Sequence, residues 1–256
     1  MRGFLAELHR RQPVLAWAGW AMLAWLALCL LAMALDGRQI GGTSVWTKPA
    51  KFAASLLPWF WTLAWAWGLL APAARRGALA WLVLGGTLAA AALEMVWITG
   101  RGAAGLPSHF ATDPIGQAMF GVMGAAATLL VLMAGLLGVL VLARGEAAQP
   151  RPWRLAVGLG LVVTGVLGLV TGFAIGGAGS PLVGAATPGL PPFFWSRDGG
   201  DLRVAHFLAV HAMQAVPGFW LLTRAGPRLV ALATLGWGGL ALGALRLAQA
   251  GVPLSP

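Results

Sequence analysis

The chain has 256 residues, of which 59% are hydrophobic and only 9% are charged. Soluble domains carry roughly 25% charged residues, so this composition excludes an ordinary soluble protein. The formal net charge is +10. However, the basic residues are spread over short segments between apolar runs, which is typical of membrane topology signals and not of a nucleic-acid interface. We therefore expect an all-α, polytopic membrane helix bundle, one transmembrane domain over residues 1–256, with no nucleic-acid partner.

Seven apolar runs are long enough to cross a bilayer, because about 20 helical residues span its hydrocarbon core. The first run exceeds the 7–15 apolar residues of a typical signal peptide, so we expect it to remain as a helix. Pro217 and Gly218 predict a kink in the sixth helix. The predicted helices cover about 14–35, 49–70, 78–99, 114–142, 155–175, 202–223 and 229–249.

The Lys and Arg residues between the helices predict the orientation of the chain. With the N-terminus inside and the C-terminus outside, ten of the 17 basic residues lie inside and seven lie outside. The chain contains no Tyr and is rich in Ala, Gly, Leu and Arg, which indicates a GC-rich, bacterial genome. We therefore expect a multi-pass protein of the bacterial inner (cytoplasmic) membrane.

Most acidic and histidine residues lie on the predicted outer side, whereas the inner half of the membrane is nearly free of ionisable groups. Ionisable side chains at lipid depth are costly and usually functional. Without an inner relay, a pump that moves protons or ions across the whole membrane is disfavoured. The distribution predicts a polar pocket that opens outward. Its candidate residues are Lys48, Lys51, Glu94, Arg101, His109, Asp113, Arg203, His206, His211 and Gln214.

The segment 197–218 changes from a Gly-rich polar loop into an apolar helix that carries two of the four histidines. His206 and His211 are five residues apart, so about 140° separates them around a helix and they cannot both face one small ion. Arg203 shares a face with His206, and Gln214 shares a face with His211. One histidine could bind haem or a metal ion; alternatively, each makes an interhelical hydrogen bond.

Other candidates lie near helix ends. Glu94 is the only acid well inside a predicted helix, about one turn from the outer end of that helix. We expect Glu94 either to form an ion pair or to bind a ligand or a proton. His109 could cover a pocket mouth or have a surface role, whereas Asp113 before Pro114 is typical of a helix N-cap. Lys48 and Lys51 could extend to the lipid headgroups or bind an anion at a helix start.

Three segments carry a resemblance to a known group of sequences. They are KPAKF at 48–52, SHFATDP at 108–114 and DLRVAHFLAVHAMQAVP at 201–217. Together they resemble an uncharacterised family of bacterial polytopic membrane proteins with the motifs KPxKF, SHF(N) and DLRxAHFxxxHxxQ. Ala111 stands where that family has Asn. The resemblance implies that the three segments form one site, and it implies no activity.

The sequence leaves three hypotheses for function and does not decide whether the protein is an enzyme. The first is a membrane redox or metal-binding protein that holds haem b or a metal ion at His206, His211 or His109, approached from the side by a quinone or lipid. The second is a binding protein or transporter for a small or anionic solute. In the third, the polar residues only connect helices to one another or to a partner.

Overall fold

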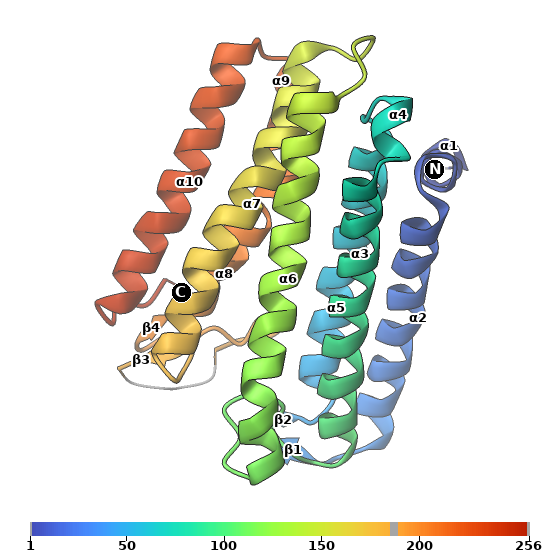
Figure 1. Ribbon diagram of the computed structural model, residues 1–256. Helices are drawn as coiled ribbons and strands as arrows, with labels where there is room; N and C mark the ends of the chain where they lie inside the picture. Colours follow the sequence, from blue (N-terminus) through green and yellow to red (C-terminus); the bar gives the residue numbers. More distant parts are fainter. Residues whose placement is uncertain (1, 185–188, 255–256) are drawn as a thin grey trace. The chain divides into compact units, whose positions relative to one another are not determined.

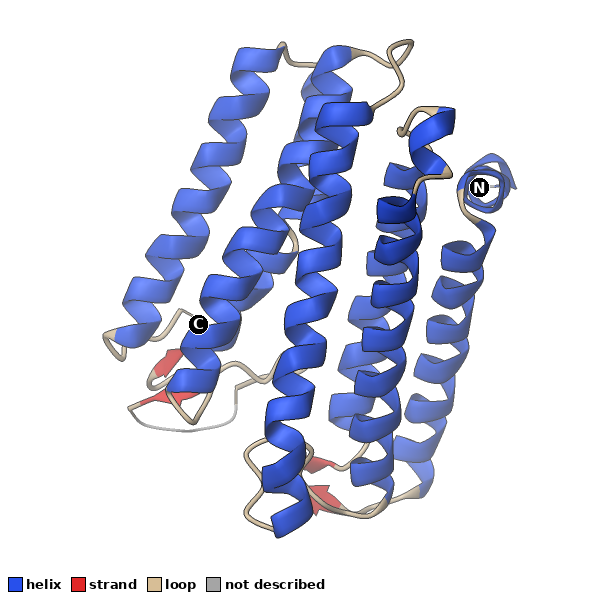
Figure 2. Cartoon of the chain, in the orientation of Figure 1, coloured by secondary structure: helices blue, strands red, loops and turns tan. Residues whose placement is uncertain are grey.

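The computed structural model describes residues 2–184 and 189–254 and is almost entirely helical (Figures 1 and 2). Helices make up 75% of the structure. Four two-residue strands pair into two antiparallel ladders, β1 with β2 and β3 with β4. Residues 185–188 of the loop predicted at 176–200 lie outside the described residues. The all-α fold class is therefore confirmed.

The described residues form ten helices and four strands. The helices are α1 (Arg2–Arg11), α2 (Pro13–Leu35), α3 (Thr47–Trp67), α4 (Pro72–Arg75), α5 (Ala78–Ala103), α6 (Pro114–Arg144), α7 (Arg151–Gly177), α8 (Leu202–Val210), α9 (Ala212–Thr223) and α10 (Pro227–Gln249). The strands are β1 (Gln39–Ile40), β2 (Thr43–Ser44), β3 (Leu182–Val183) and β4 (Gly200–Asp201).

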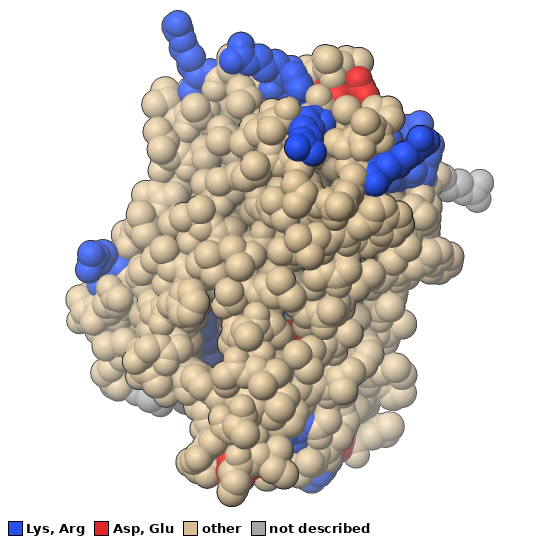
Figure 3. Space-filling model, in the orientation of Figure 1, with Lys and Arg blue, Asp and Glu red and all other residues tan. Residues whose placement is uncertain are grey.

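Among the described helices, five are long and apolar enough to cross a membrane, namely α2, α5, α6, α7 and α10. The count rises to six if α8 and α9 form one bent span. The face seen in Figure 3 consists mostly of residues other than Lys, Arg, Asp and Glu. These features fit a multi-pass membrane protein. Helix α3 has 21 residues, but its lysines and tryptophans lower its mean hydropathy, so a seventh span stays a prediction.

The chain divides into two compact units, and we describe each by itself. Unit 1 comprises Met1–Gly68 and Leu84–Leu130, and unit 2 comprises Leu69–Val83 and Val131–Pro256. Helices α5 and α6 contribute residues to both units. The single transmembrane domain expected over residues 1–256 stays a prediction.

In unit 1, α2 packs along α3, and α1 closes the end of α3. The Gly19 backbone lies so close to Trp61 that a Cβ would meet the indole at 2.1 Å. Arg11 of α1 stacks on Trp65 at 4.1 Å and donates to the Trp65 carbonyl at 2.9 Å, which gives this carbonyl at the α3 C-terminus a second donor beside the Gly68 N–H. Phe4 also stacks on Trp65. Helix α1 was not predicted from the sequence.

In unit 2, glycines allow α7 to approach its neighbours closely. A Cβ at Gly165 would lie 2.8 Å from the Gly135 Cα of α6, and a Cβ at Gly160 would lie 2.8 Å from the Ala212 carbonyl of α9. Small residues at such positions let helix backbones touch, which is the usual way that helices associate within a membrane. Helix α7 therefore lies directly against the start of α9.

Helices α8 and α9 meet at His211 with a bend of 53°, whereas the sequence predicts the kink at Pro217 and Gly218. Helix α9 continues through both of those residues. The buried Thr164 hydroxyl of α7 stabilises the bend, because it accepts from the Met213 N–H at 3.0 Å and donates to the Val210 carbonyl at 3.2 Å. A side chain inserted into the helical ladder is a recognised cause of sharp bends.

Thr164→Val is expected to destabilise the protein by about 1–3 kcal/mol, because it leaves the buried Met213 N–H without its acceptor. Hydrogen exchange should speed up at residues 211–214 in particular. Thr234→Val is the matched control, since Thr234 is also buried but bonds only to the Val230 carbonyl of its own helix. Equal exchange rates at 211–214 in the two variants would contradict the assigned role of Thr164.

Candidate functional site

Glu94 is enclosed within unit 1 and lacks hydrogen-bond partners. Its exposure is 1%, and neither carboxylate oxygen has a hydrogen-bond partner among the described residues. Helix α5 extends to Ala103, beyond the predicted end at residue 99, so Glu94 lies nine residues before the end of the helix, which is deeper than predicted. Enclosed polar atoms in native proteins are nearly always paired, so this exception requires an explanation.

The start of α3 lies against the end of α5. A Cβ at Gly102 would lie 2.8 Å from the Val45 carbonyl and 3.3 Å from the Pro49 ring, so only glycine fits there. This packing brings half-buried Lys48 close enough for its charge to act on both Glu94 and His109. Lys48, Glu94 and His109, hereafter the Glu94 cluster, are thus brought together from three segments. Lys51 is also half-buried, one turn further along α3.

The loop between α5 and α6 is fixed onto α5 by side chains of that helix. Trp97 donates its indole N–H to the Ser108 carbonyl at 2.8 Å, and Arg101 donates to the Pro107 carbonyl at 2.9 Å. The Ser108 hydroxyl lies 3.2 Å from His109 Nδ1. Phe110, the next residue, has a φ of +54°, which is a strained conformation for a bulky side chain and is found most often at functional sites.

Arg101 and Asp113 form an ion pair at the end of this loop. The Arg101 guanidinium bonds both carboxylate oxygens of Asp113, one of them at 3.1 Å. Asp113 also accepts from the Gly116 N–H at 2.9 Å, which is the predicted N-cap bond of α6. Arg101 lowers the pKa of the Asp113 carboxyl. The pair therefore neutralises its own charge and holds His109 close to α5.

The pKa of His109 falls from 6.5 to about 3, because burial and the nearby charge of Lys48 disfavour the imidazolium. The unfolded chain therefore binds more protons than the folded protein between pH 6.5 and 3, and stability should fall as the pH drops through this window. We expect the thermal midpoint of His109→Gln to depend less on pH between 7.5 and 5 than that of wild type. Identical pH profiles would contradict this.

Two more enclosed polar atoms of unit 1 lack a hydrogen-bond partner within the described part of the chain, namely Thr87 Oγ1 and Trp59 Nε1. Thr87 precedes Glu94 by seven residues, so the two side chains lie on the same face of α5, two turns apart. The interior of unit 1 therefore contains, along α5, further polar atoms without a hydrogen-bond partner among the described residues.

His206 of α8 contacts Thr171 of α7 in unit 2, with 2.8 Å between His206 Nδ1 and Thr171 Oγ1. When the Thr171 hydroxyl donates to the Leu167 carbonyl, 2.7 Å away, Nδ1 is the donor in the contact with His206. A neutral imidazole that donates from Nδ1 keeps a lone pair on Nε2. In that arrangement the Nε2 lone pair of His206 can bind a metal or accept a hydrogen bond.

His211 lies at the bend between α8 and α9 and has different partners. Its Nδ1 lies 3.2 Å from Gln214 Oε1, in keeping with the predicted shared face, and its ring packs on Phe207 with centroids 4.2 Å apart. Phe207 in turn contacts Phe193 and Trp195 of the preceding loop. His206 and His211 thus contact separate groups, as their angular separation predicts.

Arg203 bonds to Asp201 and to the loop that precedes α8. Its guanidinium donates to both carboxylate oxygens of Asp201, at 2.8 and 2.5 Å, and to the Phe194 carbonyl at 2.9 Å. Asp201 is fully buried and also accepts from the Ser196 N–H. Asp201 was not among the residues predicted for the site, although its place at the predicted start of a helix, two residues before an arginine, was a usable signal.

The candidate site residues are divided between the two units. Lys48, Lys51, Glu94, Arg101, His109 and Asp113 belong to unit 1, whereas Arg203, His206, His211 and Gln214 belong to unit 2. A single pocket built from both sets stays a prediction. Across residues 2–184 and 189–254, no group of three or more His, Cys, Asp or Glu side chains is arranged to hold a metal ion.

Comparison with known proteins adds no further constraint. No family model matches the chain, and neither the curated proteins nor the solved structures contain a match.

Proposed function

We propose that this protein binds a small polar solute at the Glu94 cluster, and that the solute donates N–H or O–H groups. The observation that carries the proposal is the Glu94 carboxylate, which is 1% exposed and has no hydrogen-bond partner on either oxygen within residues 2–184 and 189–254. Leaving buried acceptors unpaired costs about 1–3 kcal/mol or more. A ligand that supplies two donors removes this cost, which explains why such a residue is present.

The charges around Glu94 favour this class of ligand over a simple anion. The charge of Arg101 is matched by Asp113, and the charge of Lys48 acts on Glu94. A free anion would approach a buried carboxyl group without an unmatched cation to attract it. In contrast, an ammonium group can donate to Glu94 and to His109, and a polyol can both donate to Glu94 and accept from Lys48.

The membrane setting of the proposal follows the topology predicted from the sequence. The protein would lie in the bacterial inner membrane with its N-terminus inside, and the Glu94 cluster would open to the outer side. The excess of Lys and Arg in the loops assigned to the inner side supports this orientation. A site on that side would capture its solute from outside the cell membrane.

Thermal unfolding of the detergent-purified protein tests the proposal. The protein is titrated with amines, polyols and amino acids, and with chloride, phosphate and sulfate as the anion series. We expect a saturable rise in Tm with at least one donor-bearing solute, since ligand binding to the folded state raises stability. The rise should vanish in Glu94→Gln and persist in Glu146→Gln, which removes a carboxylate from unit 2.

Two results would contradict the proposal. In the first, inorganic anions raise Tm equally in wild type and in Glu94→Gln. This result would identify the cationic residues as the binding groups. The other is a Tm that no donor-bearing solute raises. In that case Glu94 and its neighbours would serve only as contacts between helices.

The geometry of His206 favours a second candidate function, haem b or metal binding. With Nδ1 donating to Thr171, the Nε2 lone pair of His206 is available, and a hydrogen bond on the opposite ring nitrogen is the usual way to orient a metal-binding histidine. Purified protein should then show a Soret band or bound metal that is lost in His206→Gln and kept in His109→Gln. An absorption spectrum without that band, together with a metal analysis at background level, excludes this candidate.

A further inference from the structure

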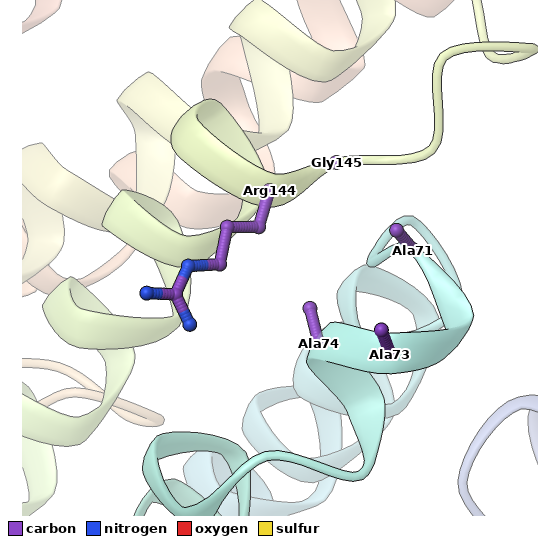
Figure 4. Close-up of a pocket in the computed structure, with 5 residues that line it drawn as sticks. All are labelled: Ala71, Ala73, Ala74, Arg144 and Gly145. Atoms are coloured by element: carbon purple, nitrogen blue, oxygen red, sulfur yellow. The ribbon is translucent and has the colours of Figure 1, made fainter.

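Unit 2 contains a hollow of about 350 Å³ near α4 and the end of α6, lined by Ala71, Ala73, Ala74, Arg144 and Gly145. Figure 4 shows the three alanines on one side and Arg144 and Gly145 on the other. This volume lies at the low end of the range for small-molecule sites, roughly 300–1,000 Å³.

Backbone hydrogen bonds fix the two walls of the hollow against each other. The Ala71 N–H donates to the Arg144 carbonyl at 2.9 Å, and the Glu146 N–H donates to the Leu69 carbonyl at 2.7 Å. Leu70 and Gly145 form an antiparallel bridge between these bonds. The backbone of the hollow is therefore fixed by the fold.

Unused donors occur at this hollow. The exposed Arg144 guanidinium has no hydrogen-bond or ion-pair partner within the described part of the chain. Arg154 donates from Nη1 to the Gly145 carbonyl at 3.1 Å, yet its enclosed Nε has no partner there. Residues 69–77 and 143–154 contain five arginines and one glutamate. The local charge is therefore strongly positive.

We infer that the hollow binds the phosphate group of an anionic lipid headgroup, with Arg144 as the main contact. Arginine presents donors in a planar fork that matches phosphate oxygens, and such charge-assisted bonds are stronger than neutral ones. The hollow lies at the end of α6 and just before α5, two helices long enough to span a membrane, and hence at headgroup depth. Basic pockets between membrane helices bind anionic headgroups in this way.

Lipid retention by the full-length protein tests the inference. The detergent-purified protein is exchanged with phosphatidylglycerol and phosphatidylcholine at equal concentration, and bound lipid is counted by native mass spectrometry. We expect preferential retention of phosphatidylglycerol, weakened about fivefold in Arg144→Gln. Arg228→Gln, which removes an exposed arginine from the first turn of α10, should bind like wild type.

Ala74→Leu distinguishes binding in the hollow from attraction to general surface charge, because it narrows the hollow and leaves the charge unchanged. It should lower phosphatidylglycerol retention while Tm and the elution volume stay at wild-type values, which also shows that the variant folds. Equal losses in Arg144→Gln and Arg228→Gln, or full retention in Ala74→Leu, would overturn the inference. Displacement of the lipid by millimolar inorganic phosphate would identify a free-phosphate site in its place.

Discussion

Glu94→Leu is expected to raise the stability of the solute-free protein by about 1–3 kcal/mol and to abolish solute binding at the Glu94 cluster. The gain arises because leucine fills a similar volume without the two acceptors that have no hydrogen-bond partner. Loss of Glu94 also removes a counter-charge from Lys48. However, Lys48 is half-buried and keeps access to water, so this cost is smaller than for a fully enclosed ion. Thermal unfolding with and without solute measures both effects.

Glu94→Gln is the matched variant for this experiment, since it keeps the polar volume but loses the charge. It should bind solute poorly and should gain less stability than Glu94→Leu. If Glu94→Leu instead lowers Tm, the carboxyl group has a structural partner, such as a buried water, and a ligand is not needed to explain its burial.

Asp201→Ala is expected to destabilise the protein by about 1–3 kcal/mol. The carboxylate is fully buried and accepts from the Ser196 N–H, the Arg203 N–H and the Arg203 guanidinium. Alanine would leave these donors without an acceptor and would remove the N-cap of α8. Thermal unfolding of the purified variant measures the loss, and limited proteolysis should then cut the loop before α8.

Arg197→Gln provides the control in the same loop, because this exposed arginine follows Ser196 in the chain but is not one of the donors to Asp201. Its Tm should stay near that of wild type, as is usual for surface substitutions. The Tm of Asp201→Asn should lie between those of Asp201→Ala and Arg197→Gln, since the amide oxygen can replace only one of the two carboxylate oxygens as an acceptor. A Tm near wild type in Asp201→Ala would show that Arg203 and the loop find other partners.

Local signals in the sequence predicted the features that depend on neighbouring residues. The Asp113–Pro114 pair predicted the start of α6, and the N-cap bond to Gly116 is present. The spacing of His211 and Gln214 predicted their contact. An ion pair was among the roles expected for Glu94, and the charge of Lys48 does act on Glu94. Each of these depends on spacing along one helix or on the few charges available at one helix end.

Features that depend on contacts between distant segments could not be predicted. The bend at His211 depends on Thr164, which is 49 residues from its partner Met213, whereas proline and glycine suggested a later position. The contact of His206 with Thr171 likewise joins residues that are far apart in the sequence. Helix α1 was missed for a different reason. Its apolar contacts and the Glu7 pairs with Arg10 and Arg11 fit a helix, but the segment is too short and basic to resemble a span.

The bend between α8 and α9 also contains its own spectroscopic reporter. The indole N–H of Trp237 in α10 donates to the Leu208 carbonyl at 2.8 Å, one turn before the bend. Indole N–H protons resonate apart from backbone amides, so ¹⁵N-labelled tryptophan gives this hydrogen bond its own signal among the 14 indoles of the chain. Any event that straightens the helix should shift this single resonance, and a Trp237→Phe sample assigns it without a label foreign to the protein.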